Sequence, residues 1–176
     1  MKKFFVALAL LVFTASIAHA KDFGCAGYKG EISVAYGFGI SNSANHFALS
    51  TTHGYQFDQS FFLGLGVEST VFEKCTFVPI FATLKYFPIN GEKRIAPFAS
   101  CRFGYGIFAS ADDDIDNGNC KGGFYTNPSI GLQFGVGKND HAIEFSVGYT
   151  YQNASYKNFN VTTKGQNIQL RLGFIF

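Results

Sequence analysis

The chain has 176 residues, of which 47% are hydrophobic, 18% are aromatic and only 15% are charged. Its 14 Lys and Arg residues nearly balance its 12 Asp and Glu residues, and no basic cluster of the kind that binds nucleic acid is present. After Ala20 there is no run of about 18 apolar residues, so the sequence excludes helical membrane spans.

The first segment, residues 1–20, has the pattern of a cleavable secretory signal. A basic start precedes the apolar run FFVALALLVF, and AHA at residues 18–20 offers small residues at the cleavage position. The apolar run is shorter than the ~20 residues that a spanning helix needs. We therefore expect Sec-type export, removal of residues 1–20 and a single mature domain at residues 21–176.

Apolar residues recur at every second position from residue 29 onward, which is the period of a β-strand with two different faces. The segment ISVAYGFGI, residues 32–40, places large apolar residues on one face and Ser, Ala and Gly on the other. Further strands with the same alternation are predicted at about 45–57, 61–69, about 76–87, 99–107, 129–137, 143–151 and 167–176. The sequence thus predicts an all-β domain of eight strands.

The links between these strands alternate in character. Short links follow residues 57, 87 and 137, whereas the links at 41–44, 72–75, 110–122 and 154–164 are polar and on average longer. Long and short links that alternate through an even number of antiparallel strands are typical of outer-membrane barrels, with short periplasmic turns and longer surface loops. Both termini would then lie on the periplasmic side.

The two faces of the strands indicate what surrounds the barrel. The polar face carries mostly Gly, Ser, Thr and Gln, which would make a poor aqueous surface but fit the narrow interior of an eight-stranded barrel. A soluble lipocalin-like barrel that binds an apolar ligand is the third interpretation. Aromatic residues near strand ends favour lipid outside, as in membrane girdles: Phe57, Phe61, Tyr86, Phe98, Phe174 and Phe176 toward one rim, and Phe38, Phe47, Phe72, Phe108, Phe124 and Tyr151 toward the other.

The chain ends in NIQLRLGFIF, with Leu170, Leu172, Phe174 and Phe176 at alternate positions. This terminus resembles the carboxy-terminal signal that bacterial assembly machinery reads on outer-membrane barrels. With the secretory signal and the alternating strands, residues 29–176 resemble the OmpX family and the OmpA transmembrane domain. The resemblance implies an eight-stranded antiparallel up-and-down transmembrane β-barrel in the outer membrane of a Gram-negative bacterium, with membrane lipid and the barrel assembly machinery as partners.

Charged residues on the inward face form the first candidate site. An unpaired charge in a lumen without bulk water is costly, so these acids and bases should pair across the barrel. A gated ion path or catalytic carboxylates would be the functional alternative, but eight strands leave no aqueous channel. We therefore expect a packing and folding network made of Glu31, Glu68, Lys85, Arg102, Glu144 and Arg171.

Cysteines follow the secretory signal, so disulfides are possible. Cys75 and Cys120 fall in surface loops that neighbour each other, and we predict a disulfide between them. Cys25 and Cys101 could pair on the periplasmic side, but the outward parity of Cys101 argues against it, and the sequence leaves their pairing open.

Function is expected to reside outside the lumen, without catalytic residue, cofactor or metal. The surface loops 41–46, 72–76, 110–122 and 154–164 could bind an extracellular ligand in a structural or adhesion-type role, since loops on a rigid scaffold commonly carry binding. The alternative is a lipid A acyltransferase or deacylase, which would need a His with a Ser or acid partner. His46 lies by the first surface loop and is expected to share neither a face nor a recognisable motif with Ser50, whereas His53 lies on the apolar face of the second strand and His141 at a periplasmic turn. The acidic residues 112–116 are interpreted as a solvated loop and not as a calcium site.

Overall fold

The computed structural model describes residues 26–40, 43–72, 75–88, 95–111, 120–136, 141–156 and 161–176. At residues 75, 108–111, 120–121, 154–156 and 161–164 the backbone alone is described. The predicted signal at residues 1–20 lies outside the described residues. Within the described ranges, no helix is long and apolar enough to cross a membrane.

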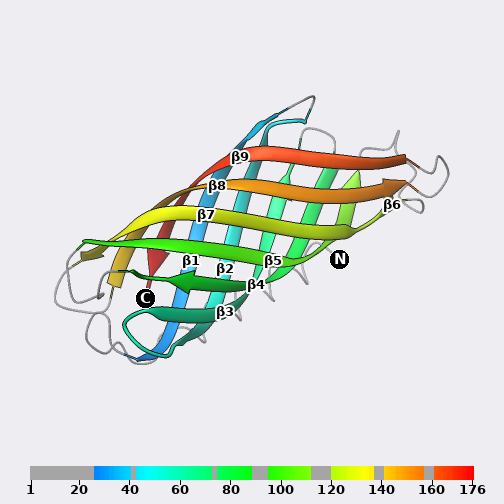
Figure 1. The fold of residues 1–176 in the computed structure, drawn as a ribbon. Helices are drawn as coiled ribbons and strands as arrows, with labels where there is room; N and C mark the ends of the chain where they lie inside the picture. The colour runs from blue at the N-terminus through cyan, green and yellow to red at the C-terminus, as the bar shows by residue number, and fades with distance from the viewer. Residues whose placement is uncertain are drawn as a thin grey trace.

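Eight antiparallel wall strands close into one barrel, which confirms the predicted fold class (Figure 1). Neighbours in the chain pair in sequence, and the last strand pairs with the first. The two-residue strand β6 pairs with β8, as β7 does, so that β6 and β7 share one place in the wall. The strands are β1 (Gly27–Gly39), β2 (His46–Gln56), β3 (Phe61–Val71), β4 (Cys75–Tyr86), β5 (Ile95–Ala111), β6 (Cys120–Lys121), β7 (Gly123–Val136), β8 (His141–Tyr156) and β9 (Val161–Ile175).

The barrel closes between β1 and β9. Their ladder runs from Glu31 opposite Ile175 to Gly39 opposite Asn167. Beyond it, Gly30 donates to the Phe176 carbonyl at 2.8 Å, and the Phe176 N–H donates to the Gly30 carbonyl at 2.9 Å. The C-terminus is therefore part of the wall. We call this end of the barrel, with the links 57–60, 87–94 and 137–140, the turn end, and the opposite end the loop end.

Two of the predicted loops are shorter than expected, because the strands continue into them. The ladder between β8 and β9 extends without interruption to Tyr156 opposite Val161, and these two strands lie side by side along their length (Figure 1). Polar residues at these strand ends satisfy their backbone groups in the ladder, although their side chains lack the apolar alternation that marks a strand in the sequence. Strand segments therefore occupy residues 110–111 and 120–121 of one predicted loop and residues 154–156 and 161–164 of the other.

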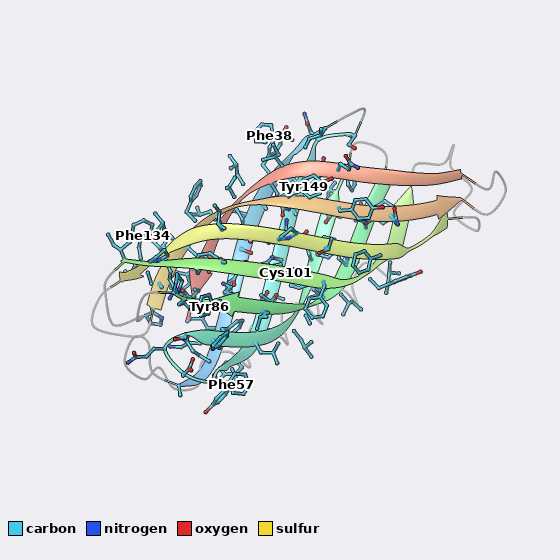
Figure 2. The ribbon with its side chains drawn as sticks, viewed as in Figure 1. Phe38, Phe57, Tyr86, Cys101, Phe134 and Tyr149 are labelled. Atoms are coloured by element: carbon cyan, nitrogen blue, oxygen red, sulfur yellow. The ribbon has the colours of Figure 1, made fainter. Side chains whose placement is uncertain are left out.

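Large apolar side chains cover the outer wall, and polar or small ones fill the lumen. Leu65 and Ile130 are 69% and 64% exposed, whereas Thr52 and Thr83 are fully buried. Figure 2 shows Phe38, Phe57, Tyr86, Phe134 and Tyr149 pointing away from the barrel. This is the reverse of a lipocalin-like barrel, whose apolar face lines the interior, so the soluble interpretation is wrong.

Rings inside the lumen pack against glycines of adjacent strands. A Cβ atom at Gly66 would lie 2.6 Å from the Phe81 ring, and one at Gly131 would lie 2.5 Å from the Phe98 ring. Glycine is therefore required at both positions, because the ring lies so close to the backbone that a side chain would occupy its space. A chain with 22 Phe and 20 Gly can fill a narrow lumen in this way.

Phe98 and Phe72, both expected at the membrane rims, lie elsewhere. Phe98 is only 3% exposed and packs with Phe62, Phe87 and Ala96 in an apolar cluster at the turn end of the lumen. The inward parity of Phe98 in β5 explains its position, since the odd-numbered residues of this strand face outward. At the loop end, Phe72 is half-buried and its ring contacts those of His46 and Phe77.

Candidate functional site in the barrel lumen

All six charged residues expected in the lumen lie there, each between 1% and 4% exposed. They come from β1, β3, β4, β5, β8 and β9, and their ion pairs join them into one chain of alternating sign. The order along this chain is Glu144, Lys85, Glu31, Arg102, Glu68 and Arg171, and we call it the lumen network. Its three acids and three bases balance in charge.

Lys85 joins two acids at the turn end of the lumen network. Its Nζ donates to Glu31 Oε2 at 2.7 Å and also to Glu144 Oε2. The same ammonium lies 5.2 Å from the ring centroid of Phe98 and 5.8 Å from that of Phe62. Two carboxylates and two aromatic faces therefore surround a single cation, and all of them stabilise its charge.

Arg102 links the two halves of the lumen network. Its Nη2 donates to Glu31 Oε1 at 2.8 Å, and its Nη1 lies 3.6 Å from Glu68 Oε2 and donates to Ser50 Oγ at 3.3 Å. The guanidinium carbon lies 5.0 Å from the centroid of the Phe81 ring. Arg102 thus spans the lumen between acids on β1 and β3.

Arg171 donates hydrogen bonds to four side chains, whereas Lys85 and Arg102 each donate to two. Its Nη2 donates to Glu68 Oε2 at 2.7 Å and to Gln169 Oε1 at 2.9 Å. Its Nη1 donates to Ser50 Oγ at 2.7 Å and to Ser33 Oγ at 3.1 Å. A buried guanidinium with this many acceptors is well compensated for its loss of water.

A neutral polar layer lies beside the network toward the loop end. The Tyr125 hydroxyl donates to Glu68 Oε1 at 3.3 Å, and Asn127 Nδ2 donates to Thr150 Oγ1 at 2.7 Å and to Gln169 Oε1 at 3.0 Å. Sequence reasoning missed Tyr125 and Asn127 because the predicted strand began at residue 129, whereas β7 begins at Gly123. Extending the same alternation backwards would have placed both side chains inward.

His46 lies inside the lumen and not in a surface loop, and it is on the same inward face of β2 as Ser50, so the expectation that the two share no face is wrong. It is buried at the start of β2, where its Nε2 is 3.4 Å from Gln169 Nε2 and its ring packs on Phe72. The preceding residues fold onto β9, since Ser43 Oγ accepts from the Gln166 N–H at 3.0 Å. His46 is therefore enclosed by protein and is not presented to lipid.

His53 and His141 lie on the outer wall toward the turn end. His53 Nδ1 is 2.6 Å from the Tyr28 hydroxyl, and its Nε2 is 3.0 Å from Thr51 Oγ1. The ring of His141 stacks on Phe174 with centroids 5.7 Å apart. Within the described part of the chain, no histidine is hydrogen-bonded to a carboxylate, and no group of His, Cys, Asp and Glu side chains could hold a metal ion.

Cys101 is a free thiol, so it forms no disulfide with Cys25. It lies near the middle of the wall (Figure 2), with Sγ 4.0 Å from Thr126 Oγ1. The side chains of Cys75 and Cys120 are outside the described set, so their disulfide stays a prediction. Cys25 also lies outside the described residues.

The terminal residues expected to form the assembly signal lie along β9. Leu170, Leu172 and Phe174 are exposed on the outer wall, and the rings of Phe174 and Phe176 stack with centroids 6.4 Å apart. A Cβ atom on Gly30 would lie 2.5 Å from the Phe176 ring, so Phe176 covers this glycine at the closing seam. The role of these residues in assembly stays a prediction.

An apolar outer wall, a closed set of eight antiparallel strands and a lumen filled by polar and paired charged side chains define a small bacterial outer-membrane β-barrel. No protein-family model matches the sequence, and no curated protein matches it. Solved structures do match. The chain is similar to Neisserial surface protein A (NspA), with a TM-score of 0.60 and 15% identity over 90% of this chain and 98% of that chain.

Two other solved structures have comparable likeness. The N-terminal β-barrel domain of Pseudomonas aeruginosa OprF gives a TM-score of 0.55 at 15% identity, covering 90% of this chain and 100% of that chain. The outer membrane enzyme PagL gives 0.52 at 15% identity, covering 80% and 97%. At this identity the likeness concerns the fold, which is that of outer-membrane barrels, and the predicted location in the bacterial outer membrane agrees with it.

Proposed function

We propose that this protein is a non-enzymatic integral outer-membrane barrel, in which the lumen is a structural core and any partner binds at the loop end. The observation that carries the proposal is the lumen network, whose acids and bases pair with one another at 1% to 4% exposure. Because these six side chains are engaged with one another, none of them is free to act as an acid, a base or a nucleophile, and the removal of one partner would be costly.

The enzyme alternative receives little support from the described histidines. PagL shares the fold and is an enzyme, but a hydrolytic site needs a nucleophile, a base and a group that orients the base. His46 is enclosed in the lumen, and His53 on the outer wall contacts hydroxyls of Tyr28 and Thr51. His53 also lies toward the turn end, which would face the periplasm. Lipid A would be found in the outer leaflet, at the other end of the barrel.

The loops 41–46, 72–76, 110–122 and 154–164 are the proposed surface for an extracellular ligand. Support comes from their place on a rigid, closed scaffold, where binding residues commonly occur. The backbones of β5, β6, β8 and β9 extend into two of these ranges, which ties them to the barrel wall.

Mass spectrometry of lipid A from host cells with and without the protein tests the non-enzymatic assignment. We expect identical acyl chains in both strains and in a strain with His53→Ala. Gain or loss of one acyl chain that depends on the protein would overturn the assignment.

The loop proposal is tested by adhesion. Cells that carry the wild type should bind a target surface better than cells in which residues 112–119 are replaced by a short Gly-Ser link. Equal binding by two equally folded barrels would exclude this loop.

A further inference from the structure

The surroundings of Lys85 have the composition of a receptor for an organic cation. Two carboxylates, from Glu31 and Glu144, accept from the ammonium, and the rings of Phe98 and Phe62 lie 5.2 and 5.8 Å from it. Aromatic faces combined with carboxylates are the groups by which proteins recognise ammonium ions. Here the ammonium that they hold belongs to the chain itself.

The partners of the two acids differ. Glu31 also accepts from Arg102 at 2.8 Å, so it would keep a cation without Lys85. For Glu144, the ion pair with Lys85 is the one that the described residues provide. Loss of the Lys85 ammonium would therefore leave a carboxylate that is 2% exposed without its ion pair, and either a proton or another cation would have to neutralise it.

A cavity of about 20 Å³, enough for about one water molecule, adjoins Lys85. Lys29, Glu31, Phe62, Phe87 and Gln133 contribute to its lining. The cavity therefore borders both the ammonium and the aromatic cluster.

We propose that Glu31, Glu144, Phe62 and Phe98 form a binding site for a primary alkylammonium ion, which Lys85 occupies as a tethered ligand. In the wild-type protein the side chain of Lys85 fills the site. This inference goes beyond the proposed function, since a non-enzymatic barrel does not require a cation site.

The test removes the tethered ligand and supplies a free one. Lys85→Ala removes Cγ, Cδ, Cε and Nζ, and propylammonium has the same four heavy atoms. The barrel is refolded from urea into lipid vesicles, and the folded fraction is read from gel mobility without boiling. At propylammonium concentrations ~10 times its Kd, the ratio of folded to unfolded Lys85→Ala protein should rise about tenfold, while the wild type should not respond.

Matched controls separate the site from other effects. Propanol at equal concentration supplies the same bulk without charge, and sodium chloride supplies a cation that gains less from aromatic faces; neither should match propylammonium. In Lys85→Ala with Glu144→Gln the orphaned carboxylate is gone, so the response to propylammonium should be lost. In Lys85→Ala with Phe98→Leu, a higher propylammonium concentration should be needed to reach the same folded fraction.

Several results would overturn the proposal. Rescue by propanol would assign the effect to lost packing, and equal rescue by sodium chloride would assign it to charge alone. A Lys85→Ala barrel that folds as well as the wild type without any added cation would show that Glu144 needs no partner. A Lys85→Ala barrel that fails to fold at every propylammonium concentration would show that the site accepts no free ligand.

Discussion

Replacing Arg171 with Met is the most direct test of the lumen network as the source of stability. Met is apolar and of similar length, so it fills the space of the side chain while it removes the guanidinium. Glu68 would lose its 2.7 Å partner and keep Arg102 at 3.6 Å and the Tyr125 hydroxyl at 3.3 Å. Removing one partner of a buried ion pair costs about 3–5 kcal/mol.

Because Glu68 keeps these two partners, we expect the free energy of unfolding to fall by about 3 kcal/mol, at the lower end of this range. The serines contribute little to it, because Ser33 Oγ and Ser50 Oγ are 2.7 Å apart and keep their mutual hydrogen bond. With a urea dependence of ~1–3 kcal/mol per M, the unfolding midpoint in lipid vesicles should fall by about 1–3 M. Tyrosine fluorescence can follow the transition, since the chain contains 9 Tyr and no Trp.

The double variant Arg171→Met with Glu68→Gln separates the ion pair from general damage. With both charges absent, no buried carboxylate is left without its partner, so the double variant should be more stable than Arg171→Met alone. The reasoning is refuted if Arg171→Met unfolds within ~0.3 M urea of the wild type, or if the two substitutions simply add.

Further predictions concern the packing, the lipid-facing wall, the closing seam and the thiols. Gly66→Ala should cost about 1–3 kcal/mol of unfolding free energy because its Cβ would meet the Phe81 ring, whereas Gly27→Ala, with open space around it, should stay within ~0.5 kcal/mol. Val67→Arg on the outer wall near the middle of β3 should cost about 2–4 kcal/mol, and Phe57→Arg at the turn end about 0–1 kcal/mol; equal costs would contradict a bilayer around the barrel. Phe176→Ala should slow the appearance of folded barrel in the outer membrane, while Phe134→Ala on β7 should not; equal rates would argue against a special role of the C-terminus. A lipid-soluble maleimide should label Cys101 in the folded barrel, and Cys75 and Cys120 should react only after reduction; labelling of all three without reductant would exclude the predicted disulfide.

Much of the fold could be predicted because a strand has a strict two-residue period. Once Ile32 is placed outside, Glu31 and Ser33 must lie inside, and the same rule applied to each strand identified all six network charges. Phe98 was assigned to a rim from its place near a strand end, although its parity already placed it inside with Ala96. The period was therefore the more reliable signal of the two.

The pairing of the charges could not be predicted in the same way. Lys85 and Glu31 are 54 positions apart in the chain, and Arg171 and Glu68 are 103 apart. Which acid meets which base depends on the stagger of the strands around the barrel and on which side chains reach across it. The loop lengths were missed for another reason, since ladder hydrogen bonds extend β8 and β9 through polar residues that show no apolar alternation.

The charges in the lumen also explain why this sequence adopts one register. A shift of one strand by one residue moves every side chain to the opposite face. If the lumen were apolar like the outer wall, such a shift would cost little, because both faces would suit lipid. With charged residues inside, a slip of β9 would turn Arg171 toward lipid at a cost of ~2–4 kcal/mol, and it would leave Glu68 without its 2.7 Å partner. The lumen network thus makes the wrong register unfavourable in two ways, because a charge would enter lipid on the outside and its partner would stay buried and unpaired on the inside. An equally well-packed apolar core could not distinguish the two registers in this way in a bilayer.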